Sequence, residues 1–130
     1  MNLILDTHIF LWYIAADRSL PAGIRDLIRD PSNRVHLSTV SLWEALVKAR
    51  LGKLSLPEQP ELYLPRQRVR HGIAALALDE QSVQHLPSLP NYHRDPFDRM
   101  LICQALERDL ILVTADEVML HYPVRTLKSE

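Results

Sequence analysis

Acidic side chains stand at both ends of the most apolar part of this 130-residue chain. In "HRDPFDRMLICQALERDLILVTAD" (residues 93–116), Asp95, Asp98 and Asp116 flank an apolar helix-like run and a short strand-like run. Each acid alone could be a helix cap or a turn residue. Together they could bind a hard cation, because such ions prefer carboxylate oxygens as ligands. The elements that position these acids distinguish between the two alternatives.

The composition is that of an ordinary globular domain, with 47% hydrophobic and 24% charged residues. Three glycines argue against glycine-rich nucleotide loops and linkers. The net charge of −1 does not indicate a nucleic-acid-binding protein, although carboxylates around a bound cation would hide such a role. The single cysteine, Cys103, excludes an internal disulfide and a thiolate zinc cluster, and we expect it in the core. The N-terminus lacks the basic region of a signal peptide, so we expect one cytoplasmic domain over residues 1–130 without a membrane span.

Strand-like and helix-like segments alternate along most of the chain. We expect strands at residues 2–5, 34–38, 73–78 and 110–114, and an edge strand at 123–127. We expect helices at residues 7–16, 19–31, 39–53, 79–86 and 97–108, and a late or interrupted helix in the proline-rich segment 54–72. This alternation predicts a parallel sheet covered by helices on both faces, that is, a three-layer α/β/α domain with a central, mostly parallel sheet.

This arrangement brings four carboxylates to one edge of the predicted sheet. Asp6 directly follows the first strand and Asp116 follows the fourth, and ligands of open α/β sheets bind beyond the carboxyl ends of the strands. Asp98 and Glu44 are expected in the first turns of two helices that begin at the same edge. Asp6 is the hardest to explain as a structural residue, because an unpaired carboxylate within "LILDTHIFLW" is costly and its only neighbouring cation is His8.

The other acids have structural alternatives. Asp95 and Asp98 match the N-cap and N3 positions of a helix, the segment "SLWE" (41–44) matches a capping box, and Asp116 could cap a short helix at "EVML". Four grouped carboxylates, however, repel one another and raise each other's pKa values. Oxygen-only ligands without cysteine favour Mg²⁺ or Mn²⁺. Such a site activates water and stabilises the transition state of phosphodiester hydrolysis.

Three segments, "LILDTHIFLW", "VSLWEALVKARLGKL" and "HRDPFDRMLICQALERDLILVTAD", together resemble the signature segments of PIN-domain ribonucleases. They are most similar to the VapC-like toxins of bacterial type II toxin–antitoxin pairs. The resemblance runs in order from residue 2 to about residue 127, and the middle third is the least characteristic part. It implies that the family's four acids are Asp6, Glu44, Asp98 and Asp116, with Thr114 as the polar residue near the fourth. Asp95 remains a competing position for the third acid.

The resemblance implies a PIN-like fold and a Mg²⁺-dependent (or Mn²⁺-dependent) endoribonuclease that leaves 5′-phosphate and 3′-hydroxyl ends. Asp6, Asp98 and Asp116 would be metal ligands, and Glu44 would complete the shell or orient the attacking water. A homodimer and a cognate antitoxin that blocks the site are also implied. RNA would be bound through its phosphates, for which the candidates are Lys48, Arg50, Lys53, Arg94, Arg99 and the basic segment 66–71.

For the antitoxin we expect an apolar groove beside the acids. The helix at residues 7–16 carries Leu11, Trp12, Tyr13 and Ile14, which is more apolar surface than one buried face needs. The helix at 39–53 adds Leu42, Trp43, Leu46 and Val47. An antitoxin segment in this groove would place an arginine or lysine against the carboxylates.

Other classes of protein remain open from the residues alone. A phosphatase of the haloacid dehalogenase type also has an aspartate after its first strand, but it requires a second aspartate where this chain has His8. A phosphoacceptor receiver domain requires an acid pair after the first strand and an aspartate after the third, and only Asp79 is present. A non-catalytic protein-binding domain, with Trp12, Tyr13 and Trp43 at its interface, would show no metal binding that depends on Asp6.

Overall fold

The computed structural model describes residues 1–93 and 95–128. Its strands are β1 (Asn2–Leu5), β2 (Arg34–Ser38), β3 (Ala74–Leu76), β4 (Ile111–Thr114) and β5 (Thr126–Lys128). Its helices are α1 (Thr7–Ile14), α2 (Ala22–Arg29), α3 (Thr39–Arg50), α4 (Pro60–Arg70), α5 (Glu80–Val83) and α6 (Pro96–Arg108), with the 3₁₀ turns η1 (Leu86–Ser88) and η2 (Met119–His121).

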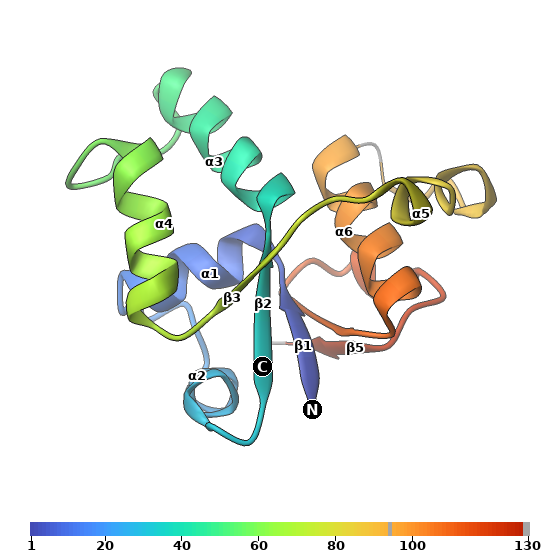
Figure 1. Ribbon diagram of the computed structural model, residues 1–130, viewed down its shortest axis with the longest axis horizontal. Helices are drawn as coiled ribbons and strands as arrows, with labels where there is room; N and C mark the ends of the chain where they lie inside the picture. The colour runs from blue at the N-terminus through green and yellow to red at the C-terminus, as the bar shows by residue number, and fades with distance from the viewer. Residues whose placement is uncertain (94, 129–130) are drawn as a thin grey trace.

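All five strands form one sheet in the order β3-β2-β1-β4-β5 (Figure 1). Every neighbouring pair is parallel, and Leu3 of β1 lies opposite Val35 on one side and Ile111 on the other. The chain builds the sheet outward from β1 to β3, and then returns to the other side of β1 to add β4 and β5. The strand order therefore reverses between β1 and β4, and in open parallel sheets such a reversal point is where ligands bind.

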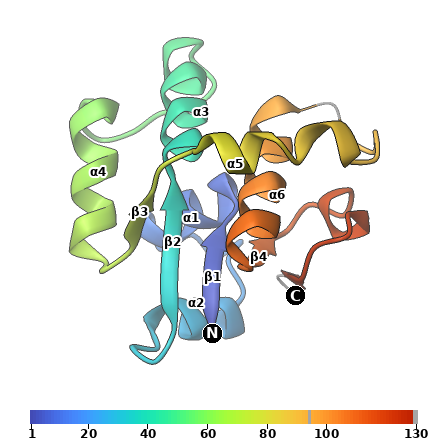
Figure 2. The ribbon, with the colours of Figure 1, turned by 45° about the vertical axis from the view of Figure 1, so that its right-hand side comes forward.

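Two apolar clusters on opposite faces of the sheet produce the three layers. Because side chains alternate along a strand, Leu3 and Leu5 belong to one cluster and Ile4 to the other. Helices α1, α2 and α4 cover the first face. Helix α6 covers the second, together with Met119 and Tyr122 of the C-terminal segment. Figure 2 shows α4 and α6 on either side of the strands. The expected three-layer α/β class is confirmed, and the sheet is parallel throughout the described strands.

Helix α3 begins at Thr39, where the sequence predicted it, but its capping residue differs from the capping-box alternative. The Ser38 hydroxyl accepts a hydrogen bond from the Val40 amide at 3.0 Å, so Ser38 is the N-cap and the helix begins at Thr39. The predicted capping box from Ser41 to Glu44 is therefore wrong, and Glu44 lies in the second turn instead of the first. The physical reason is that three hydroxyl side chains near this boundary are all able to cap, and the one directly after β2 does so.

Smaller differences concern other boundaries. Helix α1 ends at Ile14 and the chain turns at Ala16, which has a φ of 51°. Pro21 precedes α2 at its N-cap position instead of lying in the first turn. The short helix expected near Asp116 is the 3₁₀ turn η2, and the proline-rich segment forms its helix late, at Pro60, as expected. Cys103 is fully buried, and none of the described helices has the length and apolar content that crossing a bilayer requires.

Candidate metal centre

An acidic pocket of about 310 Å³ lies where β1 and β4 end and where α1, α3 and α6 begin. Its described lining consists of Asp6, His8, Trp12, Glu44, His93, Asp95, Asp98, Ala115 and Asp116. The structure thus brings together the four acids that the sequence placed at one sheet edge, and adds Asp95 to them. Five carboxylates in one pocket need compensating positive charge.

Asp6 follows β1 and occupies the N-cap position of α1, yet its side chain makes no capping hydrogen bond. Its Oδ2 accepts a hydrogen bond from the Thr114 hydroxyl at 2.8 Å, and that hydroxyl accepts one from the Asp116 amide at 3.0 Å. Its Oδ1 is buried and has no hydrogen-bond partner among the described residues. Burial raises the pKa of Asp6, and this effect exceeds the lowering by Thr114 and by the neighbouring His8. A buried carboxylate oxygen without a partner is costly unless a cation binds it.

Glu44 is buried on α3, and both of its carboxylate oxygens already have donors. Oε1 accepts from the Thr7 hydroxyl at 2.7 Å, and the same hydroxyl lies 2.9 Å from Oγ of Ser41. Oε2 accepts from the Lys48 ammonium at 2.6 Å, one helical turn further on. Burial acts to lower the pKa of Lys48, but the hydrogen bond and charge of Glu44 outweigh it and the pKa is raised. Lys48, a candidate for RNA binding, therefore compensates the charge of Glu44.

The first turn of α6 carries two aspartates in different environments. Asp95 is the N-cap, as predicted, because its Oδ1 accepts from the amides of Phe97 at 2.9 Å and Asp98 at 3.4 Å. Asp98 is 8% exposed. Burial raises the pKa of Asp98 to about 8, assisted by the charges of the other four carboxylates: Asp6, Asp95, Glu44 and Asp116. Each of these acids therefore contributes to the field at Asp98.

The potential ligand atoms of the pocket form two groups that share Asp98. One contains Glu44, Asp95 and Asp98, and the other contains His93, Asp98 and Asp116. Within each group the ligand atoms lie within 4.8 Å of one another, which is close enough for one ion to contact all three. Asp95 is therefore both the cap of α6 and a neighbour of the other acids, so its two sequence interpretations do not exclude each other.

His93 is the pocket residue that the sequence interpretation left without a role. Its Nε2 lies 3.0 Å from Oδ2 of Asp98 and 3.0 Å from Oδ2 of Asp116. The signal available in the sequence was its position five residues before Asp98, because a histidine beside clustered acids is itself typical of functional sites. The spacing alone does not show that the loop before α6 folds over the end of β4.

The basic candidates for RNA binding occupy different places. Lys53 is exposed and lines a hollow next to the acidic pocket, whereas Arg50 is exposed near Pro60, away from the acids. The Nη1 of Arg99 donates to the carbonyls of Pro90 at 3.1 Å and His93 at 3.3 Å, so this side chain holds the loop before α6. Arg94 lies outside the described residues.

The basic segment 66–71 lies on α4 and the turn that follows it. Arg66 forms an exposed ion pair with Glu58 at 3.1 Å, and Arg68 donates to the Ile73 carbonyl at 2.7 Å. None of its residues is among the described lining of the acidic pocket. The guanidinium groups of Arg66 and Arg68 therefore interact with residues directly before and after α4.

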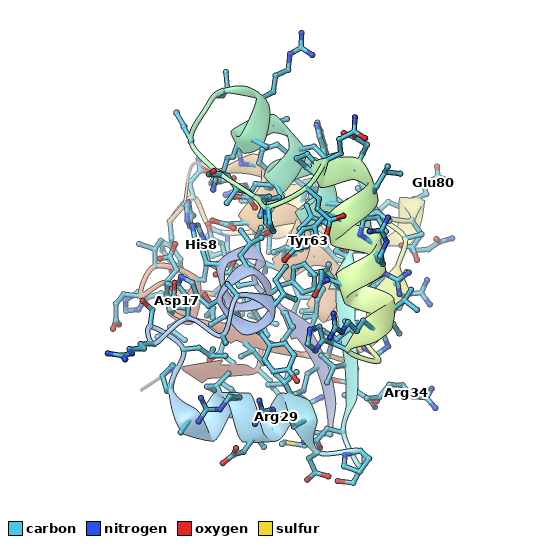
Figure 3. The ribbon with its side chains drawn as sticks, turned by 90° about the vertical axis from the view of Figure 1, so that its left-hand side faces the viewer. His8, Asp17, Arg29, Arg34, Tyr63 and Glu80 are labelled. Atoms are coloured by element: carbon cyan, nitrogen blue, oxygen red, sulfur yellow. The ribbon has the colours of Figure 1, made fainter. Side chains whose placement is uncertain are left out.

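A groove of about 370 Å³ adjoins the acidic pocket, since His8 and Trp12 line both. Helix α1 forms one wall, and the segment 53–57 with Tyr63 of α4 forms the other. Figure 3 looks onto this side of the molecule, with His8 and Asp17 on one side of α1 and Tyr63 between α1 and α4. The groove that we expected beside the acids is therefore present.

Its second wall differs from the expectation, which was the apolar face of α3. Of α3, only Lys48 is among the described lining residues. Leu42 packs against the core, and Trp43 lies edge-on to Phe97 with ring centroids 4.8 Å apart. The rotation of α3 about its axis, which is fixed where Ser38 starts the helix, decides which of its apolar residues face the groove.

The model of the PIN domain family matches residues 3–124. That match covers most of the chain, so this protein belongs to the PIN-domain family. A segment of 61 residues, 47% of the chain, is 36% identical to ribonuclease VapC16 of Mycobacterium tuberculosis. The aligned segment spans 43% of that relative's length, so the match covers less than half of either protein.

Two solved structures illustrate the likeness in fold. VapBC2 from Rickettsia felis, bound to a DNA fragment from its promoter, superposes with a TM-score of 0.75 at 16% identity over 100% of both chains. DNA-bound VapBC from Salmonella typhimurium superposes with a TM-score of 0.73 at 21% identity over 98% of both chains. At these identities the likeness concerns the fold.

Proposed function

We propose that this protein is a metal-dependent endoribonuclease that hydrolyses RNA phosphodiester bonds, and that it is the toxin of a toxin–antitoxin pair. The observation that carries the proposal is the buried Oδ1 of Asp6, which has no hydrogen-bond partner in the described part of the chain and lies in a pocket with four further carboxylates. Membership of the PIN-domain family and the similarity to a VapC ribonuclease support the nuclease activity. The VapBC complexes of similar fold support the role as a toxin.

The residues of the pocket fit Mg²⁺ or Mn²⁺. The carboxylates supply oxygen ligands, and the described lining contains no cysteine. Asp98 and Asp116, which belong to one group of close ligand atoms, would hold the ion. Asp6 belongs to neither group and would join them through its buried Oδ1, which lies in the same pocket. Asp95 lies close to Asp98 and Glu44. Thr7 and Lys48 hold the two oxygens of Glu44 in place. Through the remaining lone pairs of these oxygens, Glu44 would complete the shell or orient the attacking water. When bound, the ion lowers the pKa of water and stabilises the negative charge that develops on the phosphate.

The protein's own hydrogen bonds keep these groups in position. Thr114 holds Oδ2 of Asp6, which leaves Oδ1 available for an ion. The Asp116 amide, bound to the Thr114 hydroxyl, fixes the fourth acid relative to the first. The raised pKa of Asp98 means that without an ion this carboxyl is partly protonated near neutral pH, and an ion would displace that proton.

Replacement of Asp6 tests the nuclease proposal. We expect Asp6→Asn to abolish cleavage of a labelled RNA in Mg²⁺, because asparagine keeps the shape of the side chain but not its charge. The matched control is Asp26→Asn, the same change at an exposed position of α2, which should retain activity. Circular dichroism of both variants should match the wild-type protein. Full activity of a folded Asp6→Asn variant would contradict the proposal.

The groove next to the acids is the proposed site for the antitoxin. Its apolar lining includes Leu11, Ile14, Leu54 and Leu56, which suits an apolar helix or strand. Because His8 and Trp12 line both hollows, an arginine or lysine of the bound segment would reach the carboxylates and compensate their charge. We also propose that two copies of this chain form a homodimer.

Filling the groove tests the partner. We expect Ser55→Trp to abolish co-purification with the product of the adjacent gene, since Ser55 is exposed and lines the groove. The control Gln81→Trp, at an exposed position of α5, should still co-purify. Overexpression of the wild-type chain alone should arrest growth, and co-expression of the adjacent gene should restore it. Harmless overexpression without a co-purifying partner would refute the toxin role but not the nuclease.

A further inference from the structure

His93 places one hydrogen-bond donor between two carboxylates of the acidic pocket. Its Nε2 is equidistant, at 3.0 Å, from Oδ2 of Asp98 and Oδ2 of Asp116. These acids come from different elements, namely the first turn of α6 and the segment after β4. The two carboxylates repel each other when both are charged. An N–H that lies between them offsets part of that repulsion.

The backbone assigns the proton on this imidazole. The Asp95 amide donates to Nδ1 of His93 at 3.1 Å, so Nδ1 presents its lone pair. In this neutral tautomer the hydrogen is on Nε2, which therefore donates to the carboxylates. An Nε2 that carries hydrogen has no lone pair for a cation. In this position the ring completes a hydrogen-bonded cluster with Asp98 and Asp116 and is not a metal ligand.

The loop that carries His93 is anchored without the imidazole. The His93 amide donates to the Tyr122 hydroxyl at 2.8 Å, and Arg99 donates to the His93 carbonyl at 3.3 Å. Arg99 also lies 3.3 Å from the buried Tyr122 hydroxyl, which ties the loop to α6 and to the C-terminal segment. Changes to the ring can therefore be made while these main-chain contacts persist.

We propose that His93 is a positioning residue that closes the metal-free pocket: its Nε2–H takes the place between Asp98 and Asp116 that a divalent cation must occupy. The proposal rests on the metal site of the proposed function and adds a competitor to it. The N–H and the ion bind the same two oxygen atoms, so they exclude each other. His93 thus stabilises the metal-free protein and weakens its affinity for metal.

Two substitutions separate the functions of the two ring nitrogens. His93→Asn keeps an acceptor near the position of Nδ1 for the Asp95 amide, but removes the donor to the carboxylates. His93→Gln reaches about as far as Nε2 and returns an N–H to the carboxylates. The matched control is His85→Asn, which removes a histidine–carboxylate pair at the surface, where Nε2 of His85 lies 2.9 Å from Oε1 of Glu107.

The decisive measurement is the Kd for Mg²⁺ of the full chain, obtained by isothermal titration calorimetry, with the melting temperature in EDTA as a second readout. We expect His93→Asn to tighten the Kd about tenfold, since the hydrogen bond from Nε2 to Asp116 and the contact with Asp98 no longer have to be broken. The melting temperature of this variant in EDTA should fall. His93→Gln should resemble the wild-type protein in both respects, and His85→Asn should leave the Kd unchanged.

A weaker Kd for His93→Asn would show that His93 is a ligand, and an unchanged Kd would show that it does not compete with the ion; either result overturns the proposal. Failure of the wild-type protein to bind Mg²⁺ or Mn²⁺ at millimolar concentration would instead refute the metal site itself, and the competition with it. Nitrogen-15 spectra of His93 give an independent check. We expect the Nε2–H tautomer in EDTA and the loss of its carboxylate hydrogen bonds when Mg²⁺ is added.

Discussion

The two ends of α6 carry charged clusters of opposite character. At its C-terminal end, Arg108 pairs with Asp79, and hydrogen bonding by Ser82, followed by that pairing, lowers the pKa of Asp79 to about 2. At its N-terminal end, burial and like charges raise the pKa of Asp98 to about 8. At the C-terminal end the two charges cancel each other. At the N-terminal end Lys48 pairs with Glu44, and the other four carboxylates of the pocket form no ion pair with a lysine or arginine among the described residues.

The helix dipole does not explain this difference. Asp79 caps α5 and Asp98 lies in the first turn of α6, so both carboxylates are at helix N-termini, where negative charge is favoured. What differs is the surroundings, because Asp98 is 8% exposed and its neighbours are other acids. Such a cluster at the end of the sheet supports the proposal that a cation from solution completes the site.

The largest effect on RNA cleavage should come from removing the charge of Asp98, at the N-terminal end of α6. We expect Asp98→Ser to reduce RNA cleavage by more than the roughly 10- to 100-fold that is typical when a group supporting a metal ligand is lost. Serine cannot supply an anionic ligand to the ion. The measurement is the cleavage rate of a labelled RNA at saturating Mg²⁺. Retention of most activity would remove Asp98 from the site.

The second effect is a pH dependence of stability in EDTA. The unfolded chain loses the Asp98 proton near pH 4, whereas the folded protein keeps it to about pH 8. Between these values the folded state binds more protons, so the free energy of unfolding decreases as pH rises, by an amount on the order of a few kcal/mol. Thermal unfolding from pH 4 to pH 8 measures it.

Two additions to this experiment identify the cause. Asp98→Asn should flatten the pH dependence, because the titrating group is gone. Mg²⁺ should raise the melting temperature of the wild-type protein most at pH 8, where no proton competes for the carboxylate. A stability curve that is equally steep in Asp98→Asn would assign the effect to other groups.

At the C-terminal end of α6, we expect Asp79 to contribute a smaller pH dependence of stability, with the opposite sign. The lowered pKa of Asp79 provides stability that is present above pH 4 and is lost as the pH falls toward 2. Asp79→Ala should therefore lower the melting temperature by a few degrees at pH 7, and the difference from wild type should shrink at pH 2. Calorimetry at both pH values tests this. Any change in the Kd for Mg²⁺ would show that the two ends of α6 are coupled.

The smallest effect is expected for Asp95→Ser. Serine caps a helix nearly as well as aspartate, so the melting temperature and most of the RNA cleavage should be retained. The same assays used for Asp98→Ser provide the comparison. If the two variants show the reverse pattern, Asp95 is the third acid of the site and Asp98 supports it.

Strand and helix order could be predicted from the sequence because each element has its own periodicity. The apolar runs at 2–5 and 110–114 are short and uninterrupted, as strands buried on both faces are, and each is followed by an acid. The convergence of Asp6 and Asp116 required only that the two strands be parallel, which they are. The capping-box alternative for α3 was wrong because the local capping signals at Ser38 and Ser41 are equivalent in the sequence.

The sequence by itself determined the fold class and the edge of the sheet at which the acids meet, because both depend on the order and spacing of residues along the chain. The tertiary structure decided that Lys48 pairs with Glu44, that Oδ1 of Asp6 is left without a partner, and that His93 lies between Asp98 and Asp116. It also decided that the groove is closed by the segment 53–57 and not by the apolar face of α3. These features depend on how far each helix is rotated and how each loop folds back. Those quantities are fixed by packing between segments that are remote in the sequence, which no local pattern encodes.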